Sequence, residues 1–197
     1  MTGISISRSE LILGGQKSGK SRRAEVLAQA WLAQSDAHRV VLIATASAGD
    51  DEMRQRIARH QHDRAQRLPG IITVEEPLQL AQAICTHSRP DTLVVVDCLT
   101  LWLTNWLMPD DSEKFKQNRP LALVYKAQEA MFFESVSGAA GPLVLVGNEI
   151  GLGVIPMGRE VRTFVDALGL LNQHVAGLCE RVTLMAAGLP LTLKDRA

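Results

Sequence analysis

The chain has 197 residues, of which 46% are apolar; this suits one α/β domain with a sizeable core and excludes a disordered chain. Lysine plus arginine and aspartate plus glutamate each number 21, so the molecule as a whole offers no basic field for nucleic acid. No run approaches the ~18 apolar residues of a membrane span, and residues 1–10 lack an apolar signal region. We therefore expect a cytoplasmic protein without a membrane span. Its three cysteines, Cys85, Cys98 and Cys179, lack metal-type spacing and are expected to be reduced core thiols.

The stretch from Leu11 to Ser21 is typical of a short strand, a glycine-rich turn and the start of a helix. Gly14, Gly19, Lys20 and Ser21 stand at the spacing G-x-x-x-x-G-K-[ST]. Glycine permits backbone angles that let successive N–H groups point into one concavity, and the helix start adds its unpaired N–H groups. The alternative is a Gly/Ser turn before an ordinary helix. The position after an apolar strand favours phosphate binding, with the lysine on the β- and γ-phosphates and the serine hydroxyl on Mg²⁺.

Strand-type and helix-type segments alternate along the rest of the chain. The expected strands are 11–13, 39–45, 71–74, 92–97, 143–147, 181–186 and 191–194; the expected helices are 21–34, 50–67, 77–85, 99–107, 121–136 and 158–179. Pro77 is placed in a first helical turn, and residues 109–120 are expected to form an irregular surface loop. The alternation predicts a single α/β domain over residues 1–197, with a P-loop NTPase-like (RecA-like) fold. Its mainly parallel sheet carries helices on both faces, and its last two strands form an antiparallel pair at one edge.

Polar residues follow several of these strands. Because ligands of such sheets sit at the carboxyl ends of the strands, we expect the glycine-rich loop, Thr45, Asp97, Asn148 and Glu149 to converge on one site. Asp97 closes an apolar strand, which suits either an acid that helps to hold Mg²⁺ or an N-cap for the helix after it. Asn148 and Glu149 suit either substrate contact or capping of their own loop.

The expected helix 50–67 is strongly polar and carries His60 and His62. Residues two apart point about 200° from each other on a helix, so these two histidines cannot ligate one metal together. A histidine on a polar helix is usually a solvated residue, although histidine is also a common nucleophile or base. The arginines of this segment suit either ion pairs with Asp50, Glu52 and Asp63 or a clamp on a triphosphate.

A set of longer motifs gives a more specific indication. In chain order they are GGQKSGKS, IATA followed by DDEM, RIARHQHDR, TVEEP, VVVDCLTLWLTN, NEIGLGVIP, and R-x-x-R-x-F-x-D-x-x-G-x-x-N-Q at 159–173. Together they resemble the bifunctional adenosylcobinamide kinase/adenosylcobinamide-phosphate guanylyltransferase family of cobalamin biosynthesis, over roughly residues 10–194. The sequence departs from the family at Gly147, where threonine or serine usually precedes Asn-Glu, and at Gln16 and Lys17.

The resemblance implies roles for particular residues. His60 falls at the position of the family's guanylylated histidine, and Lys20 is the second catalytic residue. Ser21 and Asp97 would hold Mg²⁺. The residues implied to bind nucleotide are Gly14, Gly15, Gln16, Lys17, Ser18, Gly19, Lys20, Ser21, Thr45, Ala46, Ser47, Gln61, His62, Asp63, Arg64, Glu75 and Asp97.

The resemblance also implies a reaction sequence. ATP or GTP would phosphorylate adenosylcobinamide, and GMP would then pass from GTP through His60 to adenosylcobinamide phosphate, giving adenosylcobinamide-GDP and pyrophosphate. A homotrimer with the corrinoid near a subunit boundary is implied too; Trp102 and Trp106 are candidates for that contact, with core packing as an equal alternative. Two other functions stay open. One is a P-loop kinase for another small metabolite, and the other is a nucleotide-switched binding module, against which the lack of an N-K-x-D signature weighs.

Overall fold

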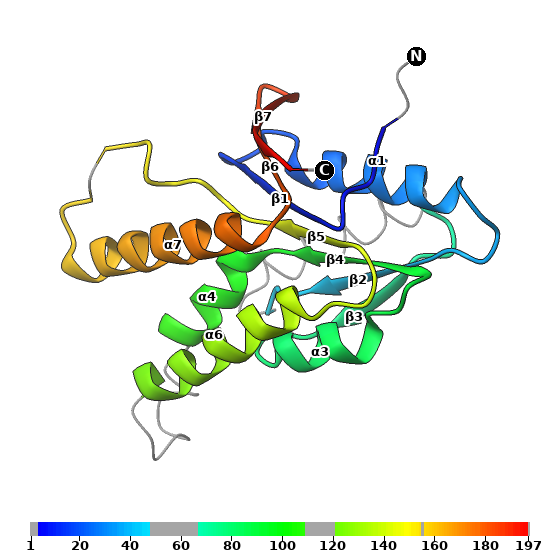
Figure 1. Ribbon diagram of the computed structural model, residues 1–197. Coiled ribbons are helices and arrows are strands. Elements are labelled where there is room, and N and C mark those ends of the chain that lie inside the picture. The colour runs from blue at the N-terminus through cyan, green and yellow to red at the C-terminus, as the bar shows by residue number, and fades with distance from the viewer. Residues whose placement is uncertain (1–3, 48–66, 109–120, 155, 197) are drawn as a thin grey trace.

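The computed structural model describes residues 4–47, 67–108, 121–154 and 156–196. The described residues form one seven-stranded sheet with the order β3-β2-β4-β5-β1-β6-β7 (Figure 1). Its strands are β1 (Ser9–Gly14), β2 (Arg39–Ala44), β3 (Ile72–Glu75), β4 (Thr92–Asp97), β5 (Leu143–Val146), β6 (Arg181–Ala186) and β7 (Leu189–Asp195). Every neighbouring pair is parallel except β6 and β7, which pair antiparallel at one edge. The predicted α/β fold with an antiparallel edge pair is confirmed.

Helices cover both faces of the sheet (Figure 1). Those in the described ranges are α1 (Lys20–Leu32), α3 (Leu80–His87), α4 (Leu99–Leu107), α6 (Leu121–Ser137) and α7 (Arg159–Leu178). Successive side chains of a strand point to opposite faces, so the apolar runs divide between two cores. In β1, Leu11 and Leu13 pack with the cluster under α3, α4, α6 and α7, whereas Ile12 packs with α1. A strand buried on both faces needs such a continuous apolar run, which the sequence shows.

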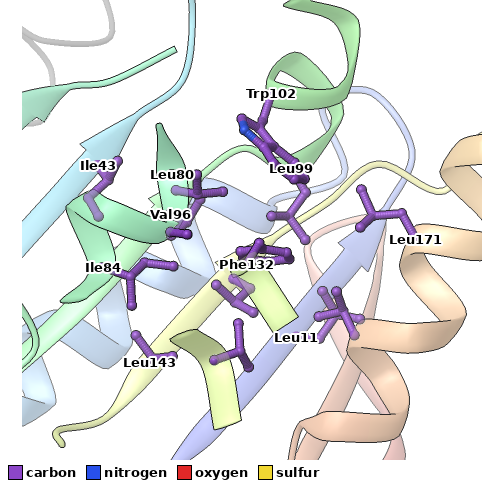
Figure 2. Close-up of a cluster of buried hydrophobic side chains, with 14 of the residues drawn as sticks. Leu11, Ile43, Leu80, Ile84, Val96, Leu99, Trp102, Phe132, Leu143 and Leu171 are labelled. Carbon is purple, nitrogen blue, oxygen red and sulfur yellow. The ribbon is translucent and has the colours of Figure 1, made fainter. Parts of the chain in front are cut away.

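The larger core contains both tryptophans of α4, Trp102 and Trp106; Figure 2 shows Trp102 beside Leu99. Trp102 is 0% exposed, its Nε1–H donates to the Leu78 carbonyl at 3.0 Å, and its ring centroid lies 5.1 Å from that of Phe132. Trp106 is also buried. Of the two alternatives for these residues, core packing is therefore the one that the structure shows, and neither ring offers a surface to a corrinoid or another subunit.

Replacing Trp102 by alanine is expected to lower the free energy of unfolding by about 3–5 kcal/mol, because it leaves a large cavity and an unpaired Leu78 carbonyl. Urea denaturation measures this loss. Trp31→Ala is the matched control, since Trp31 is only partly buried and stacks on His38 at the edge of α1. Trp31→Ala should lower the free energy of unfolding by clearly less than Trp102→Ala. A Trp102→Ala protein of unchanged stability would contradict the assignment of this ring to the core.

Two expectations differ from the structure. Helix α3 begins at Leu80 rather than near Pro77, because Glu76 Oε1 accepts hydrogen bonds from the Leu78 and Gln79 N–H groups and holds these residues in a turn. Cys85 is exposed on α3, whereas Cys98 and Cys179 are buried as expected. The helix turns Leu80 and Ile84 toward the core, and Cys85 lies off that face. In the described part of the chain no helix is both long and apolar enough to cross a bilayer.

Candidate active site

The glycine-rich loop joins β1 to α1 at the carboxyl edge of the sheet. Gly14 has φ 153° and Gly19 has φ 102°, both in the region that favours glycine. A Cβ on Gly14 would lie 2.5 Å from both the Met185 carbonyl oxygen and Ser18 Oγ, so no other residue fits there without displacing the backbone. The turn between β6 and β7 supports the loop from outside, because the Gly188 N–H donates to the Ser18 carbonyl at 3.0 Å.

Lys20 places its ammonium group inside the curve of this loop. The residue is 8% exposed, and Nζ donates to the carbonyl oxygens of Gly14 at 2.9 Å and Gly15 at 2.6 Å. Ser18 Oγ is also buried, packs against the Gly14 backbone, and has no hydrogen-bond partner among the described residues. Gln16 and Lys17 are exposed at the tip of the loop. A buried cation inside a glycine-rich turn and a helix N-terminus together form a site that suits an anion.

Ser21 and Asp97 bring two oxygen atoms together beside the loop. Ser21 Oγ donates to Asp97 Oδ2 at 3.3 Å, from the first turn of α1 to the end of β4. The N-cap position of α4 is occupied by Cys98, so Asp97 stands one residue before the cap. A hydroxyl and a carboxylate are hard oxygen donors, and Mg²⁺ binds through one or two such protein ligands with substrate phosphates and water completing its shell. The pair therefore fits that ion.

Thr45 is fully buried, and each of its polar groups already has a partner. Its N–H donates to the Asp97 carbonyl at 3.1 Å, and its hydroxyl both donates to the Cys98 carbonyl at 2.6 Å and accepts from the Cys98 N–H at 2.9 Å. Its carbonyl accepts from Asn105 Nδ2 at 2.8 Å. Thr45 thus joins the chain after β2 to the chain after β4. Ala46 and Ser47 follow it, with Ser47 exposed.

The remaining predicted residues divide into two groups. Glu75 ends β3 next to Ala44 in the strand register, at the same carboxyl edge as Asp97 and the loop. The predicted convergence is found for the loop, Thr45 and Asp97, and Glu149 also contacts the loop; Glu75 lies at the same edge although it was not part of that prediction. The predicted nucleophile and its flank, His60, Gln61, His62, Asp63 and Arg64, lie outside the described residues.

The loop after β5 lies against the phosphate loop. The Glu149 N–H donates to the Gly14 carbonyl at 3.1 Å, and Glu149 Oε1 accepts from the Gly151 N–H at 2.8 Å. The Asn148 N–H donates to Thr100 Oγ1, and the Asn148 carbonyl accepts from Asn172 Nδ2. These bonds match the capping alternative for Glu149 and tie this loop to the phosphate loop.

Sequence reasoning missed three parts of this arrangement. Asn105 on α4 bridges the Thr45 and Pro77 carbonyls, and the β6–β7 turn supports the loop. Glu25 on α1 lines a pocket next to Ser21 and Asp97. A glutamate four residues after Ser21 on the same helix face was the available signal for the last of these. The first two are contacts between distant segments and have no local signature.

Cys98 lies directly after Asp97 but is no candidate nucleophile. Burial, helped by the neighbouring Asp97 charge, raises the pKa of its thiol to about 11. A thiol with this pKa stays protonated at neutral pH, and the thiolate is the reactive form. Cys98 is therefore left out of the candidate catalytic residues.

Comparison with protein families matches residues 10–193 to the family described as cobinamide kinase / cobinamide phosphate guanyltransferase. The chain belongs to this family. A curated relative from Pseudomonas aeruginosa, named bifunctional adenosylcobalamin biosynthesis protein CobP, is 46% identical over 94% of this chain and 96% of its own. Relatives named bifunctional adenosylcobalamin biosynthesis protein CobU, from Escherichia coli and Salmonella typhimurium, are 31% and 32% identical, over 93% of this chain and 98% of theirs.

Solved structures add agreement on the fold alone. A protein from Pyrococcus horikoshii superposes with a TM-score of 0.51 at 11% identity, covering 99% of this chain and 90% of that one. The family assignment therefore depends on the sequence matches, and the arrangement of the phosphate loop, Lys20, Ser21 and Asp97 is consistent with it.

Proposed function

We propose that this member of the family phosphorylates adenosylcobinamide with ATP or GTP and then transfers GMP from GTP through His60. The products of the second step are adenosylcobinamide-GDP and pyrophosphate. One observation carries the proposal: a phosphate loop with buried Lys20 stands beside the Ser21–Asp97 pair, in a chain that matches the kinase/guanyltransferase family over residues 10–193. A cytoplasmic location and a homotrimer belong to the same proposal and are supported by the family resemblance.

In the phosphoryl transfer, the corrinoid hydroxyl oxygen attacks the γ-phosphorus while the bond to the β-phosphate oxygen breaks and the hydroxyl proton is released. The protein contributes positioning and charge neutralisation. Lys20 and N–H groups of the loop and of the first turn of α1 are assigned to the phosphate oxygens, where they would fix the triphosphate before the attack. Ser21 and Asp97 would hold Mg²⁺, which supplies positive charge to the β- and γ-oxygens when bound.

In the guanylyl transfer, the lone pair of the neutral His60 imidazole forms a bond to the α-phosphorus of GTP, and the bond to pyrophosphate breaks. A phosphate oxygen of adenosylcobinamide phosphate then displaces the imidazole from the GMP phosphorus. Ala46, Ser47, Glu75 and the segment 61–64 are assigned to nucleotide contact. Because its polar groups are all engaged, Thr45 is assigned to shaping the wall of the site rather than to bonding the nucleotide.

Incubation with GTP labelled at the α-phosphate tests this function. The protein should become covalently labelled through a bond that is acid-labile and stable in base, as a phosphoramidate is, and adenosylcobinamide phosphate should discharge the label. Phosphorylation of a small alcohol without any covalent label would instead indicate a simple P-loop kinase. Slow hydrolysis that responds only to a protein partner would indicate a switch module.

A further inference from the structure

The chain stays alongside β1 beyond the end of β5. The Gly147 N–H donates to the Ile12 carbonyl at 2.9 Å, and the Glu149 N–H donates to the Gly14 carbonyl at 3.1 Å. Alternate residues of an extended chain direct their N–H and carbonyl groups to opposite neighbours, so Asn148 faces the side of β4. The chain of β4 has already turned into α4 at this level of the register, so no described strand pairs with the Asn148 backbone.

Side chains from two helices bond the Asn148 backbone instead. Its N–H donates to Thr100 Oγ1 of α4 at 2.9 Å, and its carbonyl accepts from Asn172 Nδ2 of α7 at 3.1 Å. Backbone groups that leave a sheet need new partners, because an unpaired group away from water costs free energy. These two bonds therefore hold Asn148 in place, together with the residue on each side of it.

The Asn172 side chain is itself buried among apolar residues. It is 5% exposed, and its neighbours on the same helix, Leu168, Leu171 and Val175, belong to the larger core. Its Oδ1 has no hydrogen-bond partner among the described residues. A buried amide with an unpartnered oxygen is unfavourable for folding, and a leucine would fill the same position without that cost. Core packing therefore does not account for an amide here, whereas the bond to the loop does.

The loop that Asn172 holds is bonded to the same carbonyl as Lys20. The Gly14 carbonyl accepts from the Glu149 N–H at 3.1 Å and from Lys20 Nζ at 2.9 Å. A carbonyl oxygen has two lone pairs, and these two donors engage both of them. The Glu149 N–H thus helps to fix the direction of the carbonyl that holds the ammonium group. Hydrogen bonds and one peptide unit join Asn172 to Lys20 without a gap.

We propose that Asn172 is a positioning residue for phosphoryl transfer: by holding the loop after β5 it keeps the Gly14 carbonyl, and with it the Lys20 ammonium group, in place for the triphosphate. The inference rests on the proposed binding of the triphosphate at the phosphate loop. Asn172 acts through Lys20 and touches no reacting atom. Thr100, which bonds the N–H of the same loop residue, acts in the same way.

Asn172→Leu tests the proposal, because leucine keeps a similar size and removes the donor. Hydrogen exchange at the Glu149 amide, followed by NMR, is expected to be at least about tenfold faster, since its bond to Gly14 loses support. With adenosylcobinamide and ATP or GTP, kcat should fall about tenfold, because small misplacements of a charged group are costly in rate. The KM for the nucleotide should change by less than about threefold, because the N–H groups of the loop still bind the phosphates.

The melting temperature of Asn172→Leu should not fall. The substitution removes the unpartnered oxygen together with the donor, and Asn148 is only half-buried, so water can replace the lost bond. Val175→Ala is the matched control, since Val175 is fully buried on the same helix and makes none of the bonds to the loop. It should lower the melting temperature through its cavity and leave both kcat and the exchange of the Glu149 amide unchanged.

Thr100 supplies an independent pair of variants. Thr100→Val removes the other bond to Asn148 and should also lower kcat, whereas Thr100→Ser keeps the hydroxyl and should retain it. Unchanged exchange at the Glu149 amide in Asn172→Leu, or faster exchange with unchanged kcat, overturns the inference and leaves the proposed function intact. Parallel losses of kcat and melting temperature in Asn172→Leu and Val175→Ala also overturn it, because they indicate a purely structural role. An unaltered protein that transfers no phosphoryl group to adenosylcobinamide overturns the proposed function and the inference with it.

Discussion

Lys20→Ala is expected to lower the rate of phosphoryl transfer on the order of 10²–10³-fold, the loss found when one preorganised charge-stabilising donor is removed. The physical reason is the position of the ammonium group, which is buried within the loop and bonded to the Gly14 and Gly15 carbonyls. A cation already held there needs no reorganisation when charge develops on the phosphate oxygens. The same substitution should also weaken labelling by α-labelled GTP, because phosphoryl transfer and guanylyl transfer are both proposed to use the triphosphate bound at this loop.

Initial rates with saturating nucleotide measure the effect, together with a melting curve that tests whether the loop variant is folded. Arg22→Gln serves as the control, since it removes a neighbouring cation that contacts Glu25 and not the loop. That variant should retain its phosphoryl transfer rate. A Lys20→Ala protein that is folded and transfers phosphate within about threefold of the unaltered rate would contradict the assignment of this loop to catalysis.

Elements with a strong and continuous pattern could be predicted from the sequence. The run TLVVVD predicted a strand at 92–97, and β4 is Thr92–Asp97. The apolar helix expected at 99–107 and the strand expected at 181–186 also agree with α4 and β6. Buried parallel strands need apolar side chains on both faces, so composition alone marks them. The same reasoning placed Asp97 and Thr45 at the carboxyl edge, where the structure has them.

Contacts between distant segments could not be predicted, because they leave no periodic trace. The hydroxyl of Thr45 donates to the Cys98 carbonyl and accepts from the Cys98 N–H, 53 positions away in sequence, and no local pattern indicates this pairing. The sequence explained Gly14 by the backbone angles of the loop. The structure adds a second reason for glycine there, because the Met185 carbonyl oxygen leaves no room for a Cβ. The helix start near Pro77 was wrong because the Glu76 carboxylate organises a turn that propensity does not register.

For residues 48–66 the assigned role comes from the sequence alone, because the structure does not describe them. Composition alone was weak evidence that His60 is catalytic. Its role was assigned only from the longer motif R-I-x-x-H-x-x-x-R at residues 56–64. The structure contributes the two fixed points on either side. Thr45 is bonded to Cys98 before the segment, and Arg67 is bonded to Glu25 and Gln29 after it. The first attachment leads to the chain after β4 and the second to α1, so both flanks of the segment contact elements that border the phosphate loop or Asp97.

His60→Ala is therefore expected to abolish covalent labelling by α-labelled GTP while it leaves phosphoryl transfer to adenosylcobinamide largely unchanged. The first step uses the loop, Lys20 and a substrate hydroxyl, whereas the second needs a nitrogen lone pair that alanine lacks. Labelling is measured after acid-free denaturation, and its stoichiometry should approach one GMP per chain in the unaltered protein. His62→Ala is the control, because it retains the proposed nucleophile and should still form the adduct, even where nucleotide binding is weaker. Full labelling of His60→Ala would assign the nucleophile to another residue.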